Sequence, residues 1–87
     1  MSEYIVLSTN IKRIRKRLGM SQLQFALECD ISLKILYLIE YGETNPKLST
    51  LIKIANYCGI GVGDLFIENA ESKLNIESIF KRALFEA

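Results

Sequence analysis

Five basic side chains fall within six consecutive positions near the start of the chain: Lys12, Arg13, Arg15, Lys16 and Arg17. Residues 1–20 hold these five and one acidic residue, a net charge of +4, whereas the rest of the chain holds six basic and nine acidic residues, a net charge of −3. The chemistry that such a cluster offers is electrostatic attraction of an anion. A local anionic partner and an ordinary solvated helix face both explain it, and composition alone leaves the two open.

Side chains suited to catalysis or metal binding are scarce. Histidine, the most common general base, is absent. Cys29 and Cys58 form no CxxC pair, so zinc-ligand spacing is missing. We therefore expect no enzyme activity, no metal site and no cofactor. Both cysteines fall at apolar positions, which predicts buried free thiols in a reducing cytosol and hence a cytoplasmic protein.

The elements that must position the remaining polar side chains are clearest between residues 21 and 42. Ser21 and Gln24 form a capping-box pattern at the start of one helix. Ser32 can cap the next, and Gly42 ends it because glycine tolerates a positive φ. We expect these helices over residues 22–28 and 33–41. Two short helices joined by a tight turn predict a helix-turn-helix, with one side buried and the other free to meet a surface.

Apolar residues at three- and four-residue spacing predict helices on either side of this unit. The first ends at Gly19 and begins either near Ser2 or at the Ser8–Asn10 cluster, in which case residues 4–7 form an extended arm. The others are expected over residues 48–58, 62–66 and 76–84. The fold class is thus all-α, with five core helices and an additional C-terminal helix.

The length of 87 residues suits one small domain. We divide it into a core domain over 1–67, a polar linker over 68–74 and a C-terminal helical segment over 75–87. A domain of this size is marginally stable, so a homodimer is a natural source of further stability. The N-terminus lacks the basic region of a signal peptide, and no apolar run is long enough to span a membrane.

Residues 11–66 resemble the helix-turn-helix family of phage repressor and Cro proteins, also called the xenobiotic-response-element type. The motifs that carry the resemblance are Ile11-x-x-Ile14-Arg15, Leu18-Gly19-Met20-Ser21-Gln22, Phe25-Ala26, Ile31-Ser32, Leu36, Ile39-Glu40-x-Gly42, Asn45-Pro46, Leu48-x-Thr50-Leu51-x-Lys53-Ile54-Ala55, Gly59-Ile60 and Asp64-Leu65-Phe66. The resemblance implies a repressor-like DNA-binding domain over 1–67. It also implies a homodimeric, sequence-specific transcriptional regulator, a repressor, that binds a double-stranded DNA operator with its third helix in the major groove.

The same resemblance implies roles for individual residues. Gln22 matches the family's phosphate-contacting glutamine, and Lys34 is the strongest candidate for a guanine or phosphate contact. Arg15 and Glu40 match a partly buried ion pair, so Arg15 is expected to be structural, while the other basic residues of the first helix remain candidates for phosphate attraction. The implied DNA-binding residues are Ser21, Gln22, Ser32, Leu33, Lys34, Tyr37, Leu38, Asn45 and Lys47.

The predicted third helix departs from the family because its outward side is apolar. Leu33, Ile35 and Leu38 cannot hydrogen-bond a base edge and can only touch a thymine methyl group or exclude water. Lys34 and Ser32 are left as the main polar readers of DNA. Exposed apolar residues also mark protein interfaces. The alternative is therefore an interaction module that holds a protein partner on this helix. A weaker alternative is that these residues pack under the C-terminal segment.

The C-terminal segment carries an apolar stripe of Ile76, Ile79, Phe80 and Leu84. The stripe fits either a helix packed on its own domain or a dimer interface between two copies. Because the domain implied by the resemblance is complete near Phe66, we favour dimerisation.

Overall fold

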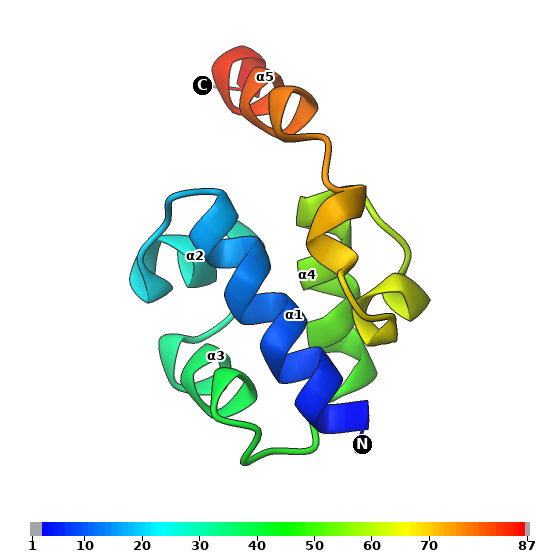
Figure 1. Ribbon diagram of the computed structural model, residues 1–87. Coiled ribbons are helices and arrows are strands. Elements are labelled where there is room, and N and C mark those ends of the chain that lie inside the picture. Colours follow the sequence, from blue (N-terminus) through cyan, green and yellow to red (C-terminus); the bar gives the residue numbers. More distant parts are fainter. Residues whose placement is uncertain (1–2, 87) are drawn as a thin grey trace.

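The computed structural model describes residues 3–86 and the side chains of residues 3–82. Helices follow one another along the chain, and no strand occurs in this range. The elements are α1 (Glu3–Arg17), α2 (Gln22–Cys29), α3 (Leu33–Glu40), α4 (Leu48–Cys58), the 3₁₀ helices η1 (Val62–Phe66) and η2 (Ala70–Lys73), and α5 (Ile76–Glu86) (Figure 1). The predicted all-α class is confirmed. The fifth predicted helix is a single 3₁₀ segment rather than an α-helix.

Helix α1 is the central element of the fold. Leu7, Ile11 and Ile14 lie on one face of it and are almost completely buried. This face packs against α3, η1 and η2, so α2 and α3 lie on one side of α1, and α4 with the 3₁₀ helices on the other (Figure 1). The helix begins at Glu3, so residues 4–7 are helical and do not form an arm.

Short-range capping fixes the ends of α2 and α3. The Ser21 hydroxyl accepts a hydrogen bond from the Gln24 backbone N–H, and the Ser32 hydroxyl accepts one from that of Ile35, each at 3.1 Å. Between the helices Asp30 is left-handed, with φ 57° and ψ 47°. Aspartate adopts this conformation more readily than most residues, so the tight turn forms without glycine. These contacts set where α3 starts relative to α2.

The segment 68–74, predicted as an exposed polar linker, has four exposed polar residues as expected, but it also contains η2 and is bonded to α1. The buried Asn10 side-chain amide donates to the carbonyl groups of Leu65 and Ile67, each at 2.8 Å, and its oxygen accepts from the Ala70 N–H at 3.4 Å. Ala70 is only 1% exposed. A buried amide requires such partners, so this segment completes the domain rather than leading away from it.

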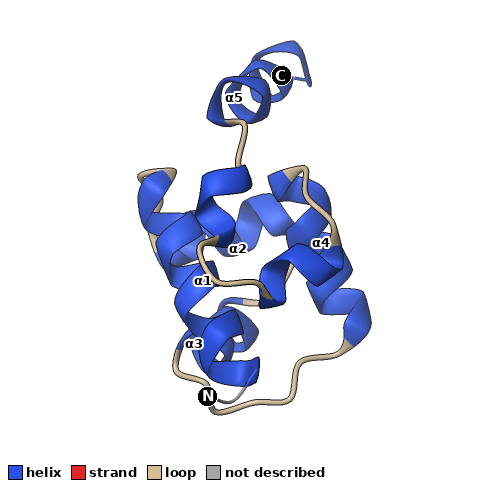
Figure 2. Cartoon of the chain, turned by 45° about the vertical axis from the view of Figure 1, so that its right-hand side comes forward, coloured by secondary structure: helices blue, strands red, loops and turns tan. Residues whose placement is uncertain are grey.

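Helix α5 lies at one end of the molecule in both views (Figures 1 and 2). The Ile79 side chain is buried in the core of its own chain, Ile76 is half-buried against that core, and Phe80 is 42% exposed. The Arg82 side chain donates a hydrogen bond to the Tyr57 carbonyl on α4. The predicted dimer interface therefore cannot use Ile79, because this side chain packs within its own protomer. The side chain of Leu84 lies outside the described residues.

Both cysteines are buried free thiols, as the apolar pattern predicted. Burial raises the pKa of the Cys58 thiol to about 12 and raises that of Cys29 as well. The thiolate is the reactive form, so both groups are inert at neutral pH. Within the described range, no group of His, Cys, Asp and Glu side chains could hold a metal ion. No helix in the same range has the length and apolar character needed to cross a membrane.

Candidate nucleic-acid interface

Helix α3 has one buried face and one face open to solvent. Leu36 and Ile39 point into the core and are at most 2% exposed. Leu33, Lys34 and Tyr37 are exposed on the opposite face, and Leu38 at its edge is half-buried. The first turn of α3 is therefore free to meet a partner, and its side chains extend beyond the body of the domain.

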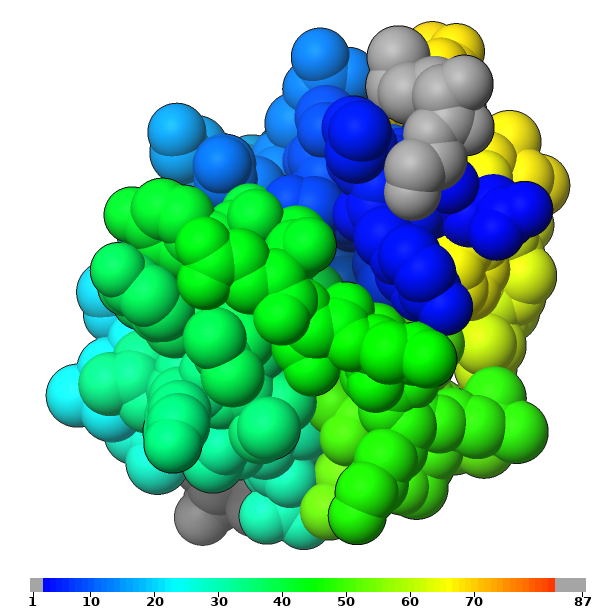
Figure 3. Space-filling model, turned by 90° about the horizontal axis from the view of Figure 1, so that it is seen from below, coloured from blue at the N-terminus to red at the C-terminus, as the bar shows by residue number. Residues whose placement is uncertain are grey.

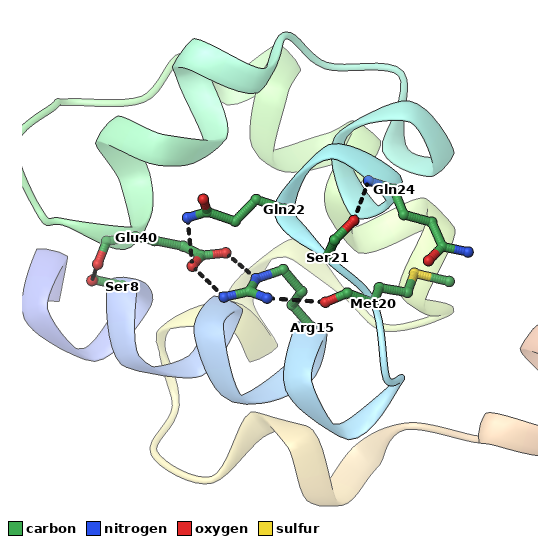
Figure 4. Close-up of polar contacts among 7 residues, drawn as sticks. All are labelled: Ser8, Arg15, Met20, Ser21, Gln22, Gln24 and Glu40. Carbon is green, nitrogen blue, oxygen red and sulfur yellow. Dashed lines mark hydrogen bonds and ion pairs between the residues drawn. The ribbon is translucent and has the colours of Figure 1, made fainter.

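A buried polar network holds α3 in place (Figure 4). Arg15, predicted to pair with Glu40, lies in direct contact with it: Nε is 2.7 Å from Oε2, and Nη2 is 3.0 Å from Oε1. The Glu40 side chain is 1% exposed and that of Arg15 14%. Arg15 Nη1 also donates to the Met20 carbonyl at 2.9 Å. The two-pronged geometry orients both groups, so the network ties α3 to α1 and to the start of α2.

Gln22 belongs to the same network. Its side-chain amide donates to Glu40 Oε1 at 3.2 Å (Figure 4). One amide hydrogen is used in this bond, and the second hydrogen and the carbonyl oxygen can still engage another group. Gln22 is the first residue of α2, where helix N–H groups attract anions. The phosphate contact that the resemblance implies for Gln22 thus stays a prediction. The side chain that would make this contact is already oriented by its hydrogen bond to Glu40.

The loop after α3 is supported by the N-terminal half of α1. The Tyr4 hydroxyl donates to Asn45 Oδ1 at 2.9 Å, and the Ser8 hydroxyl donates to the Glu40 carbonyl. Figure 3 shows α3 and this loop on one face of the molecule, next to the starts of α1 and α4. Sequence reasoning assigned roles to Asn45 and Glu40 but missed Tyr4 and Ser8, because nothing local indicates a contact between residues 41 positions apart.

Two tyrosines stack on the outer face of α3. The ring centroids of Tyr37 and Tyr41 are 4.4 Å apart, and Lys12 Nζ on α1 lies 6.0 Å from the Tyr41 centroid. Contact with Tyr41 raises the pKa of Tyr37 above its ordinary value, so the Tyr37 phenol is neutral at physiological pH. A neutral Tyr37 phenol does not repel phosphate, and Lys12 adds a positive charge at this end of the helix.

The basic cluster of α1 is therefore divided among different neighbours. Arg15 is committed to Glu40, whereas Arg13 points toward Glu71 of η2, with 3.9 Å between charged atoms. Lys12 lies beside Tyr41, and Lys16 and Arg17 are exposed. Only part of the cluster thus contributes charge next to α3.

Lys47 stands at the N-cap of α4 without a side-chain cap, at φ −67° and ψ 147°. Serine fits this extended conformation, so Lys47→Ser should raise the free energy of unfolding by about 1 kcal/mol. If Lys47 contacts phosphate, the same change should reduce the salt dependence of duplex binding by about one unit of slope. Lys47→Ala is the matched control, because it removes the charge without supplying a capping oxygen. Urea unfolding measures the change in stability, and salt titration of duplex binding measures the change in slope. An unchanged slope in both variants would remove Lys47 from the interface.

Tyr4→Phe tests whether α1 positions the loop. The change removes the hydroxyl that donates to Asn45 and should weaken duplex binding about two- to tenfold, since one hydrogen bond contributes about 0.5–1.5 kcal/mol. Asn45→Ala should lose at least as much. Adding Tyr4→Phe to Asn45→Ala should have no further effect, as measured by fluorescence anisotropy. A full additional loss in the double variant would show that Tyr4 acts by another route.

The chain is similar to a known protein family and to a solved structure. Residues 11–65 match the family HTH_3, described as Helix-turn-helix. Among solved structures the chain is similar to the hypothetical transcription factor NHTF from Neisseria, with 25% sequence identity, a TM-score of 0.72 and 83% of each chain covered. No curated protein matches. The matched range includes α2, α3 and the loop that follows them, but not Tyr4 and Ser8, which contact that loop and the end of α3.

Proposed function

We propose a function for this chain from its membership of the helix-turn-helix family HTH_3. It is a homodimeric transcriptional regulator that binds a specific double-stranded DNA operator through α3. We further propose that it acts in the cytoplasm as a repressor and needs no cofactor. A protein that occupies an operator can repress transcription there, and α3 has an exposed face suited to that task.

The observation that carries the proposal is the fixed presentation of the first turn of α3. A recognition helix places residues near its N-terminus on base edges in the major groove. Here Leu33 and Lys34 occupy that turn and are exposed, while Glu40 at the other end of α3 is bonded to Arg15 and Gln22. The inner face and the C-terminal end of α3 are thus held in place, and its first turn, which would contact base edges, is exposed.

Charge next to α3 favours an anionic partner. Lys34 on the helix, Lys47 in the loop and Lys12 beside Tyr41 are all exposed. Glu40 is buried against Arg15 and so presents no free negative charge to a duplex. Phosphate contacts by lysine release condensed counterions, so affinity should fall steeply as salt rises.

A homodimer accounts for how so small an interface could achieve specificity. Two copies related by a two-fold axis would present two α3 helices to half-sites roughly 34 Å apart, which is one turn of DNA. Of the apolar residues first assigned to dimerisation, the exposed Phe80 remains the best candidate, because Ile79 is used inside the protomer.

Selection of bound duplexes from a random pool, using the full chain, tests the proposal. We expect an enriched palindrome with half-site centres about 10 base pairs apart. Light scattering of the selected complex should give two chains per duplex. Failure to enrich any sequence at low salt would overturn DNA binding, whereas enrichment of a single half-site by one chain would overturn the homodimer alone.

A second candidate function is protein binding, which the exposure of Leu33, Tyr37 and Tyr41 favours. These side chains are 43%, 47% and 59% exposed, and aromatic residues are enriched at protein interfaces. In that case no duplex should bind even at low salt, and Leu33→Lys should break an assembly that light scattering detects.

A further inference from the structure

We propose that α3 selects its operator by contacting thymine 5-methyl groups, with Leu33 and Leu38 placed on thymines in base pairs near the one that Lys34 contacts. This inference rests on the proposed function and specifies which bases the site prefers. The resulting half-site contains a guanine flanked by thymines.

The outward side of α3 combines one exposed leucine, one half-buried leucine and one cation. Leu33 is 43% exposed and Lys34 follows it, while Leu38 lies one turn beyond Lys34 at the edge of the same face. Leu33 and Leu38 are five residues apart, about 7.5 Å along the helix axis. At 3.6 residues per turn they are also about 140° apart around the helix, on opposite sides of Lys34, so the two leucines address different base pairs.

The energetics of the major groove favour thymine at those pairs. Every base presents hydrogen-bonding atoms in the major groove, and a leucine would strip them of water without replacing the lost bonds. Thymine alone offers a methyl group to an apolar side chain. Leu33 and Leu38 therefore disfavour the other bases at their positions as well as attracting thymine.

Hydrogen-bonding capacity on this surface is otherwise limited. The Ser32 oxygen already accepts the Ile35 N–H, which leaves its O–H as a donor, and the Tyr37 ring stacks on Tyr41. Lys34 is thus the main cation available for a guanine, whose O6 and N7 accept hydrogen bonds. In other DNA-binding helices polar side chains supply sequence specificity, whereas in α3 it depends on contacts with thymine methyl groups.

The lysines around this surface indicate that its occupant is a duplex rather than an apolar protein segment. Lys34 lies between the leucines on α3, Lys12 lies beside Tyr41 just after the end of the helix, and Lys47 lies in the loop that follows. All three lysines are exposed, and so is Glu43 near the end of α3. A helix of a protein partner would leave these ammonium groups facing apolar surface. A major groove instead offers methyl groups at its floor and phosphates along its edges.

Replacing single thymines by deoxyuridine in the selected duplex tests the inference, because the change removes only the 5-methyl group and leaves the protein intact. At one or two thymines in a half-site the Kd should rise about fourfold, the factor that corresponds to one buried methylene. The salt slope should not change, since a methyl contact releases no counterion. Thymines outside the half-sites are the internal control and should show no effect.

Leu33→Ala assigns the contact to its side chain. Leu33 is exposed, so this variant should fold normally, as circular dichroism would show. At the thymine that Leu33 contacts, deoxyuridine should no longer weaken binding by the variant. If the selected duplex binds and every deoxyuridine duplex binds equally well, the methyl inference is overturned while DNA binding stands. If no duplex is ever selected, the proposed function fails first.

Discussion

Arg15→Ala is expected to lower the free energy of unfolding by about 3–5 kcal/mol, the cost of leaving a buried charge without its partner. The Glu40 carboxylate is 1% exposed and would lose both guanidinium bonds, at 2.7 and 3.0 Å. The Gln22 amide would remain its neighbour, but a neutral donor cannot compensate the charge. Urea unfolding monitored by circular dichroism measures the change.

Two further variants separate the ion pair from general effects of mutation. Arg17→Ala removes an exposed arginine two residues away and should change stability by no more than about 0.5 kcal/mol. Arg15→Met combined with Glu40→Leu removes both charges and should recover most of the loss, because apolar replacements of a buried pair are often neutral or stabilising. If Arg15→Ala costs no more than Arg17→Ala, the pair does not hold α3 in place.

Lys34→Ala is expected to weaken binding to the selected duplex about fivefold to 150-fold, corresponding to about 1–3 kcal/mol for a direct base contact. Lys34 is exposed on the first turn of α3, so stability should change little. If Lys34 contacts guanine, specificity should relax at one base pair. If it contacts phosphate, affinity should fall for all sequences and the salt slope should drop by about 1.

The control for Lys34 is a lysine far from α3. Lys81 on α5 pairs with Glu77 at 3.2 Å, and its removal subtracts the same charge from the protein. Lys81→Ala should therefore change the Kd less than twofold, as measured by anisotropy at one salt concentration. An equal loss in both variants would mean that net charge, rather than the position of Lys34, determines affinity.

The features that sequence predicted well depend on short-range rules or on a family pattern. The all-α class and the family resemblance are both confirmed. The caps at Ser21 and Ser32 involve a donor three residues away, so the local sequence contains both partners. The pairing of Arg15 with Glu40 spans 25 positions, and only the resemblance indicated it.

The features that sequence missed depend on contacts between distant residues. Asn10 binds η2 across 60 positions, which made a polar segment part of the domain. Ile79 belongs to the buried core of its own chain, and no periodicity shows which neighbour an apolar stripe will meet. The support of the loop by Tyr4 likewise requires that α1 and Asn45 first be brought together.

Binding of the full chain to the selected operator and to a scrambled duplex of equal composition tests the central claim most directly. At physiological salt the operator should bind at least about a thousandfold more tightly, the lower end of the range for specific DNA-binding proteins. Its Kd should rise steeply with added salt. Equal affinity for the two duplexes, or no binding to either at low salt, would contradict sequence-specific recognition of DNA through α3.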